Sequence, residues 1–147
     1  MQSLNLPSYD YKVTKKDGKA YIWDVIRKQY VRLTPEEWVR QHMIHFLADH
    51  LNCPVTLMSV ETGLQYNTLA KRSDILVFDR KGKAWLVVEC KSFEIALDNL
   101  AVRQVSVYNQ TIRAPYVAIT NGIRHHCWSI DANGESMPLE EFPKFPD

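Results

Sequence analysis

Three charged side chains interrupt two apolar runs that otherwise have the character of buried strands. Asp74 begins one run, and Glu89 and Lys91 end the next. Alternation along a strand places Glu89 and Lys91 on the same face. If the two runs pair through a turn at 80–83, Asp74 and Glu89 lie nearly opposite each other at one end of a sheet. The sequence therefore predicts two carboxylates and an ammonium group close together.

Two neighbouring carboxylates repel each other unless a positive charge lies between them. A divalent cation meets that need, and carboxylate and carbonyl oxygens suit Mg²⁺ or Mn²⁺, which can also bind a phosphate oxygen. Lys91 could then orient an attacking water and offset charge on the phosphate in the transition state. We interpret the three residues as a candidate site for phosphodiester hydrolysis. The alternative is a salt-bridge cluster at the surface.

A second predicted helix, from about 95 to 111, carries two polar residues that could reach the same pocket. Gln104 falls on the face defined by the apolar residues of this helix, where a buried amide needs a partner. Gln104 and Tyr108 are four positions apart and project together. The alternative is a glutamine satisfied at the edge of the core.

A first helix is predicted over about 35–51, where Thr34 is a typical N-cap and two acids follow in the first turn. Glu36 is in line with the apolar face of this helix, whereas Glu37 lies about 100° away. Glu36 is therefore expected to point inward. The alternative is that Glu36 only stabilises the helix dipole and pairs with Arg40.

In this order, the motifs resemble those of the PD-(D/E)XK nucleases and, within them, the N-terminal nuclease domain of type I restriction enzyme R subunits. The resemblance rests on Ser73-Asp74-Ile75, Val88-Glu89-Cys90-Lys91 and Gln104-Val105-Ser106-Val107-Tyr108, with similar flanking stretches at 24–28, 33–41 and 118–122. It extends over residues 9–130. Ser73 replaces the proline that often precedes the first aspartate.

The resemblance implies a metal-dependent endonuclease that hydrolyses DNA with Mg²⁺ or Mn²⁺. It implies that Asp74 and Glu89 bind the metal with help from an acid of the first helix, for which Glu36 rather than Glu37 is our candidate. It also implies that Lys91 is the catalytic lysine, and that Gln104 and Tyr108 lie near the substrate or position the lysine. The chain contains no GxxxxGK[ST] phosphate loop, so we do not expect it to translocate DNA by itself.

The remaining pattern predicts an α/β domain with a mixed central sheet flanked by helices. We expect a hairpin over 9–24, strands over 55–61, 73–79, 84–91, 116–120 and 123–130, and a single domain over 1–147 whose core spans 9–130. The tail over 131–147 is expected to be irregular, because its prolines show no periodicity.

Composition limits the function only loosely. The 147 residues are 46% hydrophobic and 24% charged, with a net charge of +1, which indicates a globular domain without a bulk electrostatic signature. Arg72, close to Asp74, is the first choice for a phosphate contact. Three unpaired cysteines favour a cytoplasmic protein, and no apolar run predicts membrane insertion.

Two rival functions remain open at this level. One is a DNA-binding or protein-docking module that retains the fold without catalysis, against which the intact Asp74, Glu89 and Lys91 argue. The other is a nuclease acting on RNA or on structured nucleic acid. The near-neutral charge predicts weak binding by the isolated chain, so a homodimer or a separate specificity or motor subunit would supply affinity.

Overall fold

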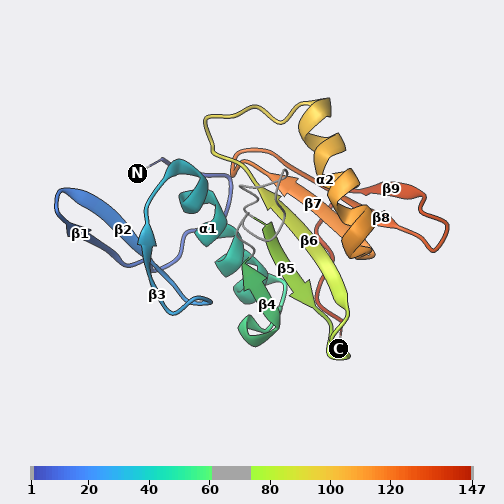
Figure 1. The fold of residues 1–147 in the computed structure, drawn as a ribbon, viewed down its shortest axis with the longest axis horizontal. Coiled ribbons are helices and arrows are strands. Elements are labelled where there is room, and N and C mark those ends of the chain that lie inside the picture. Colours follow the sequence, from blue (N-terminus) through green and yellow to red (C-terminus); the bar gives the residue numbers. More distant parts are fainter. Residues whose placement is uncertain (1, 61–73, 147) are drawn as a thin grey trace.

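The computed structural model describes residues 2–60 and 74–146, which form two sheets and two long helices (Figure 1). The elements in chain order are β1 (Val13–Lys16), β2 (Lys19–Asp24), β3 (Gln29–Arg32), α1 (Pro35–His50), the 3₁₀ turn η1 (Val55–Leu57), β4 (Met58–Val60), β5 (Asp74–Phe78), β6 (Ala84–Cys90), α2 (Asn99–Ile112), β7 (Tyr116–Thr120), β8 (His125–Ile130) and β9 (Ser136–Leu139). None of the helices in these ranges is long and apolar enough to cross a membrane.

The larger sheet has the strand order β4-β5-β6-β7-β8-β9. Strands β6 and β7 are parallel, because the chain crosses over through α2 between them, and the other neighbours are antiparallel. The predicted mixed α/β sheet is thereby confirmed.

The two helices cover opposite faces of this sheet (Figure 1). Alternate residues of β6 divide between two hydrophobic clusters. Leu86 and Val88 pack with the apolar residues of α1, whereas Val87 packs with Ala101 and Val105 of α2. Because side chains alternate along a strand, any residue at an odd position near the end of β6 faces the α2 side.

The smaller sheet contains the predicted N-terminal hairpin and one further strand. Asp17 and Gly18 both have positive φ, 53° and 77°, as a two-residue turn between twisted strands requires. Strand β3 then pairs with β2. Sequence patterning missed β3 because its four residues are too short to show a clear alternation.

Helix boundaries follow from the capping residues. Thr34 accepts a hydrogen bond from the backbone N–H of Glu37, and α1 begins at Pro35 as expected. The second helix begins at Asn99 rather than near 95, because Asp98 accepts a hydrogen bond from Ala101 N and so fixes the N-cap.

The C-terminal tail is more ordered than predicted. Strand β9 pairs with β8 at the edge of the larger sheet. Phe145 is buried in the cluster beneath α1, its ring is 5.4 Å from that of Trp85, and its backbone N–H donates to Leu51 O. Pro138 lies within β9, opposite Trp128, and the segment that follows the strand packs onto the core.

Candidate active site

Strands β5 and β6 bring the two acidic positions of the predicted site opposite each other. Asp74 and Glu89 are Cα partners in the antiparallel ladder, as we predicted from a turn at 80–83 between the two strands. The turn after β5 is held by the Asp79 carboxylate, which accepts hydrogen bonds from Lys81 N and Lys83 N. The register then shifts by one residue between Val77 and Phe78, and this irregularity brings Asp74 opposite Glu89. A one-residue slip would move every side chain of β6 to the other face.

Glu89 and Lys91 lie together at the end of β6. The Glu89 side chain is 2% exposed, and its Oε2 is 3.4 Å from Nζ of Lys91. The backbone N–H of Lys91 donates to Thr120 O at the end of β7, which continues the parallel pairing one residue beyond β6. A buried carboxylate is costly without a charged or hydrogen-bonding partner, so the position of Lys91 stabilises it.

Both residues face the side of the sheet that α2 covers. Glu89 follows Val87 on the same face, and its neighbour in β7, Ile119, belongs to the cluster under α2. The site therefore has α2 as its neighbouring helix, as the sequence requires if Gln104 and Tyr108 are to contribute.

The predicted burial of Gln104 is wrong. The residues of α2 that pack inward are Ala101, Val105 and Asn109, and Gln104 is exposed, as is Leu100. The small side chains of Ala101 and Val105 pack against the sheet, whereas the sequence pattern placed Leu100 on the buried face of the helix. Gln104 is accordingly accessible to a bound molecule. The side chain of Tyr108 lies outside the described residues.

The predicted orientation of the first-helix acids is also reversed. The Glu37 side chain is 8% exposed and that of Glu36 is 36% exposed. The helical pattern pointed to Glu36 because Val39 and Met43 mark the apolar face. Arg27, a basic residue from outside the helix, instead draws Glu37 inward, which a pattern within one helix does not reveal.

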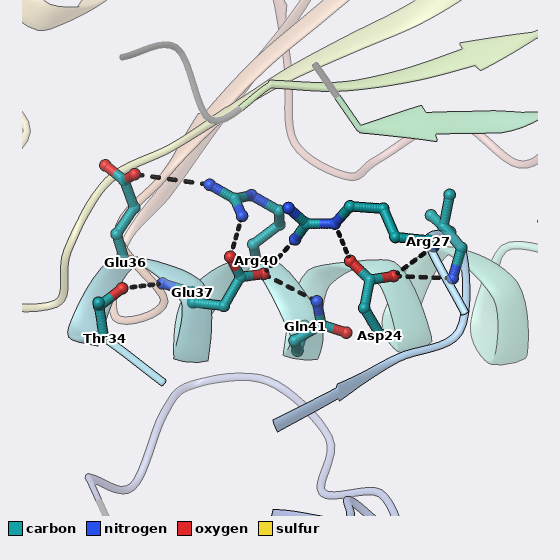
Figure 2. A network of polar contacts seen from close by, with 8 residues as sticks. Asp24, Arg27, Thr34, Glu36, Glu37, Arg40 and Gln41 are labelled. Atoms are coloured by element: carbon teal, nitrogen blue, oxygen red, sulfur yellow. Dashed lines mark hydrogen bonds and ion pairs between the residues drawn. The ribbon is translucent and has the colours of Figure 1, made fainter. Parts of the chain in front are cut away.

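Glu37 is held by a network that sequence reasoning missed (Figure 2). Its Oε2 accepts hydrogen bonds from Arg27 Nη2 at 3.0 Å and from Gln41 Nε2 at 2.8 Å. Its Oε1 pairs with Arg40. Both carboxylate oxygens are thus engaged, and the contact with Arg27 joins α1 to the segment after β2.

The same network continues to Asp24, the last residue of β2. Its carboxylate accepts hydrogen bonds from Arg27 Nε and from the backbone N–H groups of Ile26 and Arg27. Burial alone would raise the pKa of Asp24, but these hydrogen bonds and the Arg27 charge outweigh it and lower that pKa. Burial opposes the charge on Arg27, yet Glu37 and Asp24 together raise its pKa. The sequence signal was an acid at a strand end with a base three residues later.

Glu36 occupies a different position. Figure 2 shows its carboxylate directed away from that of Glu37, with Oε2 3.5 Å from Nη2 of Arg40. The i,i+4 pair with Arg40 that the sequence suggested is therefore present. The helix α1 lies on the sheet face opposite Glu89. Glu36 could therefore approach a metal at Glu89 only around the end of the strands, because the sheet separates the two faces.

No group of three or more His, Cys, Asp or Glu side chains that could hold a metal gathers among the described side chains, which do not include that of Asp74. Arg72, the predicted phosphate contact, also lies outside the described residues. Glu89 and the backbone position of Asp74 nevertheless fit the donor set that a hard divalent cation prefers, two carboxylates at one strand end.

A half-buried histidine at the start of β8 lies on the sheet face opposite Glu89 and was not predicted to have a role. Thr120 and His125 are partners across β7 and β8, with Thr120 Oγ1 2.7 Å from His125 Nδ1. His125 Nε2 is 2.9 Å from Asn5 O, which requires a proton on Nε2 and leaves Nδ1 to accept from the threonine hydroxyl. Burial lowers the pKa of His125.

Residues 35–146 match a family model described as the type I restriction enzyme R protein N terminus (HSDR_N). No curated protein and no solved structure matches the chain. The match includes α1, both strands of the candidate site and the C-terminal segment. It begins at the first residue of α1, so the three-stranded sheet lies outside the matched range.

Proposed function

The chain belongs to the family of type I restriction enzyme R protein N-terminal domains, and on that premise we propose that it is a divalent-metal-dependent DNA endonuclease of the PD-(D/E)XK type. The observation that supports this most directly is the joint placement of the three residues. Asp74 and Glu89 are register partners, and Lys91 lies beside Glu89. Those are the residue types that phosphodiester hydrolysis requires.

Asp74 and Glu89 would hold Mg²⁺ or Mn²⁺, with Glu36 as the proposed third acidic residue. When bound, the ion would polarise the phosphate and lower the pKa of a water molecule. Glu89 suits this role because its carboxylate is already held in one place by burial and by Lys91.

Lys91 would hold the attacking water and offset the negative charge that develops on the phosphate. In the reaction, the water gives up a proton to solvent as its oxygen forms a bond to phosphorus, the bond from phosphorus to the leaving sugar oxygen breaks, and that oxygen takes up a proton from solvent. The Lys91 side chain is 24% exposed, so its ammonium group is reachable by substrate while remaining near Glu89.

Gln104 and Tyr108 would contact the DNA from α2, and Arg72 would contact a phosphate. The exposure of Gln104 supports this role, because a buried amide could not reach a substrate. Family membership suggests DNA and other subunits as partners. A specificity or motor subunit, or a second copy of the chain, would then supply affinity that the near-neutral domain lacks.

Cleavage of supercoiled plasmid and of single-stranded DNA in Mg²⁺ or Mn²⁺, beside EDTA controls, tests the proposal. We expect metal-dependent cutting that is lost in Glu89→Gln and Lys91→Met. The matched controls are Glu94→Gln and Lys81→Met, which change exposed residues of the same types and should cut as the unmodified protein does. Absence of cutting by the unmodified protein in both metals and on both DNAs would contradict the proposal.

A further inference from the structure

The three-stranded N-terminal sheet has one face against α1 and one face open to solvent. Ile22 and Asp24 of β2 are completely buried, so the residues that alternate with them point away from the domain. We use the term outer face for the six residues Lys16, Lys19, Tyr21, Trp23, Tyr30 and Arg32. The register joins them across the strands, with Lys16 opposite Lys19, Trp23 opposite Tyr30 and Tyr21 opposite Arg32.

This part of the chain has an excess of positive charge that the rest of the chain lacks. Residues 11–32 contain seven lysines and arginines and two aspartates, a formal charge of +5, whereas the whole chain carries +1, which leaves −4 for the other residues. Arg27 and Asp24 are engaged in the buried network. The positive charge of the outer face is therefore a local feature that the net charge conceals.

The cations of the outer face have no acidic partners within the described part of the chain. No ion pair there involves Lys16, Lys19 or Arg32. Lys16 and Lys19 stand directly opposite each other, an arrangement of like charges that destabilises a sheet. A sheet that keeps such a pair without compensation is better explained by an anionic partner than by its own stability.

Aromatic rings lie between these charges. Tyr30 is 44% exposed, and its ring meets that of Trp23 edge to face with centroids 5.2 Å apart. Trp23 and Tyr21 are half-buried. Rings held in this way offer a rigid surface on which an unpaired base can stack, while neighbouring cations bind the phosphates on either side.

We propose that the outer face binds a single strand of DNA, through phosphates at Lys16, Lys19 and Arg32 and through base stacking on Tyr30. The proposal rests on the proposed nuclease function for its choice of nucleic acid. It goes beyond that function because the outer face lies outside the matched family range and contains none of the cleavage residues. The sheet would act as a guide that holds the strand while another part of it is cut.

Fluorescence anisotropy in EDTA measures this binding without cleavage. The probe is a fluorescein-labelled oligothymidine of about 20 nucleotides, compared with a duplex of the same length. For Lys16→Gln/Lys19→Gln we expect about tenfold weaker binding and a salt dependence reduced by roughly 1.4 in the slope of log K against log salt concentration. The matched control, Lys81→Gln/Lys83→Gln, makes the same charge change in the exposed turn after β5 and should bind as the unmodified protein does.

Tyr30→Ser separates stacking from charge. We expect at least about fivefold weaker binding of the oligothymidine with an unchanged salt slope. Because the lysine pair is repulsive, the double lysine variant should unfold at the same temperature as the unmodified protein or a higher one, which excludes misfolding as the cause of lost binding.

Equal weakening by the two lysine double variants would overturn the proposal, as would failure of the unmodified protein to bind the oligothymidine at low salt. Duplex binding as tight as single-strand binding, with no effect of Tyr30→Ser, would overturn the assignment to a single strand. Polyglutamate competing as well as DNA would replace the proposal by an acidic protein partner. Binding of the oligothymidine without cleavage in Mg²⁺ or Mn²⁺ would reject the nuclease function and still support binding at the outer face. Cleavage that is unaffected when outer-face binding is lost would support the nuclease function and reject the outer face as a guide for the strand.

Discussion

The ammonium group of Lys91 lies 3.4 Å from Oε2 of Glu89, one residue beyond the strand that carries the glutamate. The arrangement stabilises the buried carboxylate and leaves the lysine partly accessible. Removing either charge should therefore affect the chemistry, and Lys91→Met should also lower the free energy of unfolding because it removes the ammonium group beside the buried Glu89 carboxylate.

We expect Glu89→Gln and Lys91→Met each to lower the cleavage rate by about 100-fold or more, because each removes a charge at the position of the reacting phosphate. Both variants should retain the far-UV circular dichroism of the unmodified protein. The measurement is the initial rate of plasmid nicking. A Lys91→Met variant that cuts at the unmodified rate would remove Lys91 from the mechanism.

The two acids at the start of α1 should behave differently from each other. Glu37→Gln should lower the free energy of unfolding by about 3 kcal/mol, because it leaves Arg27 and Arg40 without the carboxylate that they share. Glu36→Gln should change it by less than about 1 kcal/mol, since its pair with Arg40 is partly exposed. Urea unfolding of both variants provides the comparison.

The same pair of variants also tests the proposed metal ligand. Glu36→Gln should require a higher Mg²⁺ concentration for half-maximal cleavage while keeping its stability. An unchanged Mg²⁺ requirement would show that the first helix supplies no ligand through Glu36.

The C-terminal segment should contribute to stability. Phe145→Ala is expected to lower the free energy of unfolding by about 3 kcal/mol, because it empties a buried site against Trp85. The control is Phe142→Ala, a half-buried residue nearby, for which a smaller loss is expected. Equal losses would mean that burial of Phe145 is not the source of the effect.

Stability should decrease as the pH falls below about 6.5, the unperturbed value for histidine. Burial lowers the pKa of His42 and of His125. The unfolded chain therefore binds protons at a pH where the folded protein does not, and this favours unfolding until the lower folded-state pKa is reached. Urea unfolding at several pH values measures the decrease.

His125→Gln should reduce that pH dependence, whereas His126→Gln, at the neighbouring exposed position, should leave it in place. A flat profile for the unmodified protein between pH 7 and 5 would contradict the lowered pKa values of His42 and His125.

Much of the fold follows from local sequence. The hairpin at Asp17-Gly18 is set by its turn residues, and the start of α1 at Thr34-Pro35 is set by its cap. The turn after β5 brings Asp74 to within one residue of Glu89, and the register shift between Val77 and Phe78 completes the pairing. These signals act over a few residues, so they can be recognised without knowing what packs against them.

Tertiary structure alone decided which face of each helix is buried. Glu37 points inward because Arg27, from the segment after β2, and Arg40 share its carboxylate, and Gln104 is exposed because Ala101 and Val105 fit the sheet better than Leu100 does. The position of Phe145 depends likewise on a site formed by residues distant in the chain. Whether a side chain is buried depends on contacts between segments that are distant in the chain. The periodicity of one segment therefore cannot predict which of its faces is buried.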